Sequence, residues 1–284
     1  MIAPSRLQTL PRRDLPEGAA WILVAITVAF LTLFLVVPVV AVFAVAFSRG
    51  VAGFVRAVST PETAAALRLT AATALVAVPL NTLFGVVAAW TVTKYRFRGK
   101  TLLLTLMDLP FAVSPVVAGL MFVLLFGARS TLGAWLGDHG VRVLFAFPGI
   151  ALATLFVTFP FVARELVPLM EALGSEEEIA ASSLGASSWQ IFWRVTLPNI
   201  RWGLFYGVIV CTARALGEFG AVSVVSGHIR GETNTVPLHV EILFNEYDQA
   251  GAFAVASLLT LVGLAALVAK KLVEWRIASQ EGVQ

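Results

Sequence analysis

The sequence predicts an all-α integral membrane protein with six transmembrane helices. The chain has 284 residues, of which 58% are hydrophobic and 13% are charged, and its mean hydropathy is +0.88. Soluble domains carry about 25% charged residues. Six apolar stretches can each cross a hydrocarbon core of about 30 Å at about 1.5 Å per helical residue. Because unpaired backbone groups are costly in lipid, each crossing is expected to be helical.

The first apolar stretch covers residues 19–47 and contains no charged residue. Three arginines precede it and Ala44-Val45-Ala46 looks like a cleavage site, so a signal peptide is the alternative. A signal peptide has an apolar core of only about 7–15 residues, so this stretch is interpreted as the first transmembrane helix. The five further spans are expected at residues 69–93, 101–128, 143–163, 202–227 and 249–269.

The distribution of basic residues predicts the orientation. With the N-terminus in the cytoplasm, thirteen Lys and Arg residues fall in cytoplasmic segments, six in outer segments, and Arg214 within a span. The positive-inside rule therefore places both termini in the cytoplasm. The excess of 20 basic over 17 acidic residues suits this orientation and does not require a nucleic-acid partner. One membrane domain is expected at 19–275, between cytoplasmic tails at 1–18 and 276–284.

Several residues that look chemically active have simpler interpretations. Gly99-Lys100-Thr101 ends like a phosphate-binding loop, but Lys94 stands where that loop needs a glycine and the segment joins two spans. ATP hydrolysis must then come from another chain. The histidines lack metal-ligand spacing and are expected to be solvated loop residues; they are His139, His228 and His239. Cys211 lies in an apolar run and is expected to be a small core residue.

The longest predicted cytoplasmic connection contains a patterned segment at residues 176–198. It begins with three glutamates, which suit a helix N-terminus, and Gly185 can end that helix. Pro198 is expected to stop or kink the helix that follows. Small Ala180 and Ala181 lie near bulky Trp193, so a short element could seat in another protein's groove.

This segment resembles the EAA loop of ABC-importer permeases, and we call residues 176–198 the EAA-like segment. The family pattern is Glu-Ala-Ala, three residues, Gly, nine residues, then Ile-x-Leu-Pro. Ile179 stands at the expected glutamate position, with Glu178 one position before it. The resemblance assigns ATPase coupling to Glu178, Ala180, Ala181, Gly185, Val195, Leu197 and Pro198. An ordinary amphipathic interfacial helix is the alternative.

The third predicted span carries a cluster of helix-bending residues. Asp108, Pro110, Ser114 and Pro115 lie within eight positions. Prolines free backbone carbonyls and bend helices, which membranes tolerate where a cavity or a neighbour satisfies those groups. A gate or pathway wall is therefore expected, with a packing kink as the alternative.

The fifth predicted span holds a buried charge. Arg214 lies about 20 Å along a helix from Arg201, where a charge costs about 2.5–3.5 kcal/mol on insertion scales. Glu218 follows at i+4, so a structural ion pair is one interpretation and an anion route is the other. The candidate pathway residues here are Arg214, Glu218, Phe219 and Gly220. Gly203 and Gly207 in the same span are read as a helix-packing pair.

The run from Arg194 to Gly227 resembles sulfate/thiosulfate permeases of the CysW type, and molybdate permeases share parts of it. The resemblance extends over about residues 20–275. It implies a multi-pass subunit of the bacterial inner (plasma) membrane that works with a second, similar permease. Two cytoplasmic ABC ATPases would bind ATP and Mg, and a periplasmic or extracellular sulfate-binding protein would deliver the anion. No cofactor is expected in this chain. The alternatives are a molybdate or other oxyanion permease and a non-transporting membrane assembly protein.

Overall fold

The computed structural model describes the backbone of residues 17–281 and the side chains of residues 19–273, so most of the predicted N-terminal tail lies outside the described residues. The described part is built from helices. Their bounds are α1 Glu17–Leu31, α2 Val37–Ala46, α3 Gly50–Val58, α4 Pro61–Lys94, α5 Lys100–Ala112, α6 Pro115–Phe126, α7 Thr131–Asp138, α8 Phe147–Thr158, α9 Pro160–Leu173, α10 Glu176–Ser183, α11 Ser188–Ile191, α12 Leu197–Leu216, α13 Gly220–Ser226, α14 Val236–Asn245 and α15 Gln249–Glu281, with π-helical turns η1 Thr32–Val36 and η2 Phe192–Thr196.

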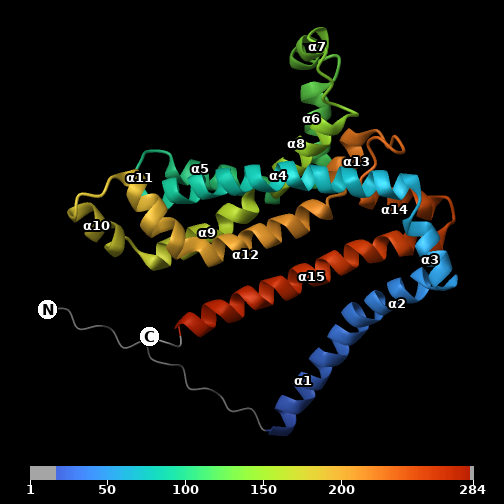
Figure 1. Ribbon diagram of the computed structural model, residues 1–284, viewed down its shortest axis with the longest axis horizontal. Helices are drawn as coiled ribbons and strands as arrows, with labels where there is room; N and C mark the ends of the chain where they lie inside the picture. The colour runs from blue at the N-terminus through green and yellow to red at the C-terminus, as the bar shows by residue number, and fades with distance from the viewer. Residues whose placement is uncertain (1–16, 282–284) are drawn as a thin grey trace.

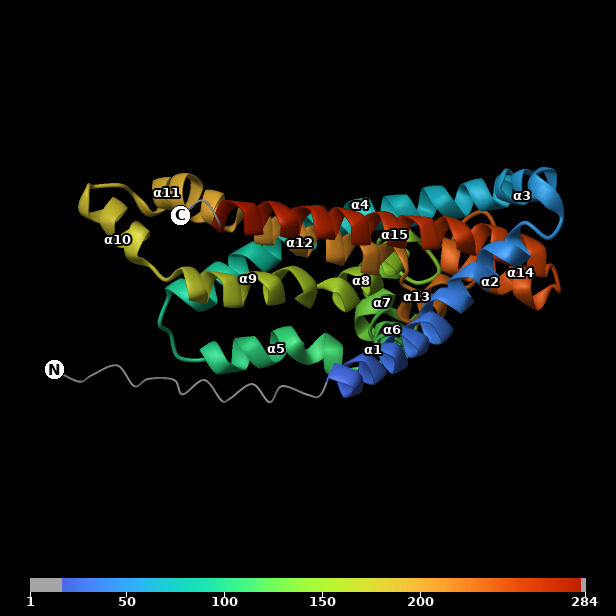
Figure 2. The same cartoon turned by 90° about the horizontal axis from the view of Figure 1, so that it is seen from below.

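The long helices α4, α12 and α15 run along the longest axis of the molecule (Figure 1). At one end of this axis lie α10 and α11, and at the other lie α3 and α14 (Figures 1 and 2). The largest buried cluster joins α4, α9 and α12 and includes Val162, Leu166, Ile200 and Cys211. Cys211 is fully buried, which confirms its assignment as a core residue.

Four helices are long and apolar enough to cross a membrane: Ala19–Ala46, Pro61–Lys94, Phe147–Leu173 and Gln249–Val273. They correspond to the first, second, fourth and sixth predicted spans. The second starts at Pro61 rather than at residue 69 because the Thr60 side chain accepts a hydrogen bond from the Thr63 N–H and caps the helix there.

The third and fifth predicted spans are broken helix pairs, and with each pair counted as one span the described chain has up to six. The axes of α5 and α6 meet at 106°, and the helix 188–216 meets α13 at 48°. The bend expected from the prolines is present at Pro115. Ser114 takes an extended ψ of 135°, as a residue before proline must. As a result, α6 stands across the long helices (Figure 1).

The helix that begins at Ser188 does not stop at Pro198, so of the two expected outcomes, a stop or a kink, the stop is wrong. The helix runs unbroken from Ser188 to Leu216 and contains the π turn η2 directly before α12. Pro198 lies in the first turn of α12, where a missing N–H is tolerated once the π turn has changed the hydrogen-bond register. Both glycines of the predicted packing pair face α9: a methyl group on Gly203 would lie 2.3 Å from Leu169 Cδ2, whereas one on Gly207 would make an ordinary 3.4 Å contact with Val162 Cα.

The expectation that all three histidines are solvated is wrong for His239. Residues 236–245 fold as α14, and His239 on it is 3% exposed with Nε2 3.1 Å from Thr63 Oγ1. Burial lowers the pKa of His239 below its ordinary value of 6.5, and the positive charge of Arg230 lowers it further. His139 is exposed, and the His228 side chain is 40% exposed beside Glu241.

Candidate functional site

The residues selected from the sequence fall into two groups. The EAA-like segment forms one end of the molecule as α10, α11, η2 and the start of α12 (Figure 1). Pro115 and the residues that follow Arg214 lie where the two bent helix pairs pack together, because α6 contacts α13.

Within the EAA-like segment, a glycine separates two short helices as expected. Gly185 follows α10 with a φ of +86°, a left-handed conformation that side chains with a Cβ rarely adopt. Helix α11 then begins with a capping box in which Ser187 and Gln190 satisfy each other's backbone N–H groups. The predicted helix, break and helix are therefore present.

The outer surface of this segment is apolar and uncovered. Leu184 is 89% exposed and Ile179 is 63% exposed. An open hollow beside them is lined by Ala181, Leu184, Gly185, Ala186, Gln190, Ile191, Arg194 and Val195. Exposed apolar groups gathered around a hollow are typical of a surface that another protein covers. Ala180 is also exposed, whereas Leu197 is half-buried at the start of α12.

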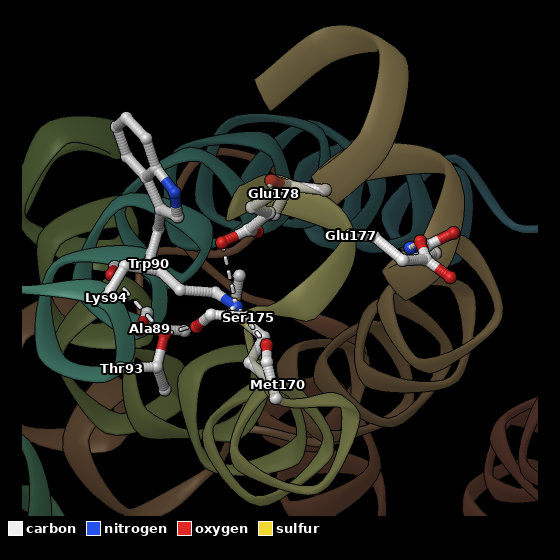
Figure 3. A network of polar contacts seen from close by, with 11 residues as sticks. Ala89, Trp90, Thr93, Lys94, Met170, Ser175, Glu177 and Glu178 are labelled. Atoms are coloured by element: carbon white, nitrogen blue, oxygen red, sulfur yellow. Dashed lines mark hydrogen bonds and ion pairs between the residues drawn. The ribbon is translucent and has the colours of Figure 1, made fainter. Parts of the chain in front are cut away.

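Glu178 points into its own chain. Its Oε2 lies 3.0 Å from Lys94 Nζ on the last turn of α4, and its Oε1 accepts a 2.6 Å hydrogen bond from Thr196 Oγ1. Figure 3 shows the carboxylate and the ammonium facing each other between the helices. In the sequence, Lys94 drew notice only as the residue that replaces a glycine of a phosphate-binding loop, and no local spacing pairs it with Glu178.

Arg214 and Glu218 form the ion pair that their spacing predicted. Arg214 Nη1 lies 2.6 Å from Glu218 Oε2, and the side chains are 33% and 1% exposed. The other carboxylate oxygen accepts a 3.0 Å hydrogen bond from the Ala221 N–H in the first turn of α13. Glu218 therefore neutralises the arginine and also caps the helix after the break.

The two helix breaks touch each other. A methyl group added to Gly220 at the start of α13 would lie 2.9 Å from Pro115 Cβ at the start of α6. One turn further along, a methyl group on Gly119 would lie 2.8 Å from the Ala221 carbonyl oxygen. Phe219 is 41% exposed. The start of α6 and the start of α13, which are far apart in the sequence, therefore form one packed unit.

Asp108 and Pro110 lie outside this unit. Asp108 is exposed and lines a pocket with Arg164 between α5 and α9, while Pro110 is buried inside α5. Arg164 itself stands 4.8 Å from the centre of the Phe111 ring. Ser114, the exposed residue before α6, makes no side-chain cap for that helix. Of the four residues chosen in span three, only Pro115 packs directly against α13 by these contacts.

Within the part of the chain that the structure describes, no group of three or more His, Cys, Asp or Glu residues could hold a metal ion.

The chain matches the family model "Binding-protein-dependent transport system inner membrane component" over residues 81–279. It belongs to this family. The match covers α12 with the Arg214–Glu218 pair and the whole EAA-like segment. The protein is thus an integral membrane permease subunit of an ABC transporter, and its own role is in transport.

Curated relatives are similar over nearly the full chain. The sulfate transport system permease protein CysW of Escherichia coli (strain K12) is 51% identical over 92% of this chain and 90% of its own length. The CysW protein of Synechocystis is 49% identical over 93% and 95%. The sulfate transport system permease protein CysT of Escherichia coli (strain K12) is 37% identical over 93% of both chains.

Solved structures share the fold at lower sequence similarity. A chain of a bacterial alginate ABC transporter, solved with a periplasmic protein carrying an alginate pentasaccharide, superimposes with a TM-score of 0.74 at 15% identity. It covers 90% of this chain and 93% of its own length. A second alginate importer structure gives a TM-score of 0.71 at 17% identity, with 91% and 96% coverage.

Proposed function

We propose that this chain is a membrane permease subunit of an ATP-driven sulfate/thiosulfate importer. The observation that carries the proposal is the identity of 51% and 49% to two CysW proteins over more than nine-tenths of the chain. Both the EAA-like segment and the Arg214–Glu218 pair lie inside the aligned length. The 37% identity to CysT supports a second, similar permease as the partner that completes the pathway.

Surface features of this chain support the other proposed subunits, which are two ATPases and a binding protein. Exposed Leu184 and Ile179 beside an open hollow offer a docking surface to a cytoplasmic ATPase that binds ATP and Mg. A dimer of two permeases offers one such surface on each, which calls for two ATPases. An extracytoplasmic binding protein would deliver sulfate to the opposite end. In this proposal the chain lies in the bacterial inner membrane with both termini in the cytoplasm, an orientation that the distribution of basic residues supports.

Helix continuity supports a mechanism for the transport step. The helix from Ser188 to Leu216 spans 29 residues, so it joins the docking surface to the Arg214–Glu218 pair over about 40 Å. ATPase closure would move α10 and α11, and this helix would carry the displacement to the break at Gly217. Arg214 is one-third exposed and offers a guanidinium to a passing oxyanion, while Glu218 holds it in place.

The test is uptake of labelled sulfate into liposomes that contain this chain with its co-purified permease and ATPase partners and the binding protein. We expect saturable uptake that stops when ATP is replaced by a non-hydrolysable analogue, and competition by thiosulfate stronger than by molybdate. Stronger competition by molybdate would move the assignment to a molybdate permease. An assembled complex that hydrolyses ATP without moving any of these anions would refute the oxyanion proposal.

A further inference from the structure

We propose that Lys94, Glu178 and Thr196 form a clamp that transmits movement of α10 to α4 and α12, and thereby couples ATP hydrolysis to transport. This inference deepens the proposed function and rests on it. It assigns Glu178, the glutamate nearest the EAA position, to an internal positioning role. The contact with the ATPase is then left to the exposed apolar side chains of the same helix.

Helix α10 has no rigid covalent connection to the helices on either side. Gly174 precedes it with a φ of +68° and Gly185 follows it with a φ of +86°, so neither α9 nor α11 continues into it as a helix. None of its residues is buried. A force applied to α10 is therefore transmitted poorly through these two glycine turns or through an apolar core, and side-chain contacts give it a more direct route to the membrane helices.

Lys94 provides the connection to α4. Its ammonium donates a 2.5 Å hydrogen bond to the Gly174 carbonyl, lies 3.4 Å from Ser175 Oγ, and pairs with Glu178 at 3.0 Å. These contacts hold the residues just before α10 and the first turn of α10 itself (Figure 3). The Lys94 side chain is 11% exposed and the Glu178 side chain is 18% exposed, so solvent screens the pair only weakly.

Thr196 provides the connection to α12. It is 3% exposed, ends the π turn η2, and donates to the Glu178 oxygen that Lys94 does not use. A second contact runs beside it, from the Asn199 side-chain amide to Glu177. One carboxylate is thus held on one side by α4 and on the other by the helix that leads to Arg214.

A charged pair is a poor choice if its only purpose is to hold α10 in place. Removing two charges from water is costly, and an apolar contact of similar volume often stabilises a fold as well or better. A hydrogen-bonded pair is directional, however, and fixes the angle between the helices that it joins. This property suits a joint that must move as one body when α10 is displaced.

The test compares the complex containing the wild-type chain with Lys94→Glu, Glu178→Lys and the double exchange. Three quantities are measured in liposomes: recovery of the ATPase subunits, the rate of ATP hydrolysis, and the sulfate moved per ATP hydrolysed. Each single variant is expected to keep its ATPases and hydrolyse ATP. It should move at least about fivefold less sulfate per ATP, because about fivefold is the low end of typical coupling between two sites. The double exchange should restore part of this ratio, because it rebuilds the ion pair but not the hydrogen bonds from Lys94 to Gly174 and from Thr196 to Glu178.

Glu176→Lys is the matched control, because Glu176 is exposed on the same helix turn and makes no ion pair among the described residues. It should leave the ratio unchanged. A normal ratio in both single variants, or a double exchange as poor as the singles, would overturn the clamp. If charge reversal prevents assembly, Lys94→Met and Glu178→Gln are judged by the same ratio. If the wild type carries another anion, the ratio is measured with that anion, so failure of the sulfate assignment remains distinguishable.

Discussion

The ion pair between Arg214 and Glu218 is unequally buried: the carboxylate is 1% exposed and the guanidinium is 33% exposed. The carboxylate is also fixed by the Ala221 N–H at 3.0 Å. Glu218 is therefore an anchor in the protein interior, and Arg214 is the partner that reaches a surface. This asymmetry favours an arginine that can exchange its interaction with Glu218 for one with a passing anion.

Replacing Arg214 by Ala should reduce both stability and transport. The change leaves the Glu218 carboxylate buried without its cation, which costs up to about 3–5 kcal/mol for a buried pair. We expect a lower thermal unfolding midpoint for the complex and a loss of sulfate uptake of at least about tenfold, or about 1.4 kcal/mol in the barrier. Arg214→Lys keeps the charge but loses the planar fork, so uptake should recover only in part.

A double variant separates the two roles of this arginine. Arg214→Ala with Glu218→Gln removes both charges, so it should recover much of the thermal stability while uptake stays low. Normal uptake in the double variant would show that the pair is only structural.

Gly185→Val should weaken coupling through backbone strain. No atom lies within 4 Å of the position of an added Cβ, so the Cβ itself has space, but the φ of +86° remains unfavourable for a β-branched residue. Such a conformation costs about 1–2 kcal/mol and would be relieved by a shift of α10 against α11. Sulfate moved per ATP should fall. Gly185→Asn is the control, because Asn tolerates this conformation, and equal ratios for Val and Asn would contradict the argument.

Local pattern predicted much of the site. The Arg214–Glu218 pair follows from i+4 spacing on one helix, and the break at Gly185 follows from the backbone freedom of glycine. Hydropathy located the spans because lipid forces each apolar stretch to satisfy its own backbone hydrogen bonds. These features depend on residues close together in the chain.

The features that sequence reasoning missed depend on how distant segments pack. The Lys94–Glu178 pair joins the end of α4 to α10, and no spacing rule links positions so far apart. The prolines predicted a bend but not that it would reach 106° and bring Pro115 against Gly220. His239 lies on α14 among apolar residues, and its burial depends on packing against Thr63 at the start of α4, which is far away in the sequence.

His239 should make the end of the protein formed by α3 and α14 sensitive to acid. Burial and Arg230 lower its pKa in the folded state below 6.5, and Glu62 and Glu246 oppose this only in part. The unfolded chain therefore takes up a proton at a higher pH than the folded chain. The stabilisation is complete above pH 6.5 and is lost as the pH falls through the folded pKa, at up to about 1.4 kcal/mol per pH unit.

The measurement is the thermal unfolding midpoint of the purified complex between pH 7.5 and pH 5. His239→Gln cannot titrate, so its midpoint should fall less steeply with acid than that of the wild type. Parallel curves for the two proteins would show that other groups account for the acid sensitivity.

Gly119 tests whether the packed unit of the two helix breaks is needed for transport. A methyl group there would lie 2.8 Å from both the Ala221 carbonyl oxygen and Val224 Cβ, so α13 would have to move. Overpacking of this kind costs about 1–3 kcal/mol, and the displaced α13 would pull the Ala221 N–H away from Glu218.

Gly119→Ala should therefore lower uptake more than Gly263→Ala, since an added methyl group at Gly263 meets no atom within 4 Å. Because Glu218 holds Arg214, the loss should appear in transport even where the complex still assembles and hydrolyses ATP. Equal uptake by the two variants would mean that transport does not depend on the close contact between α6 and α13.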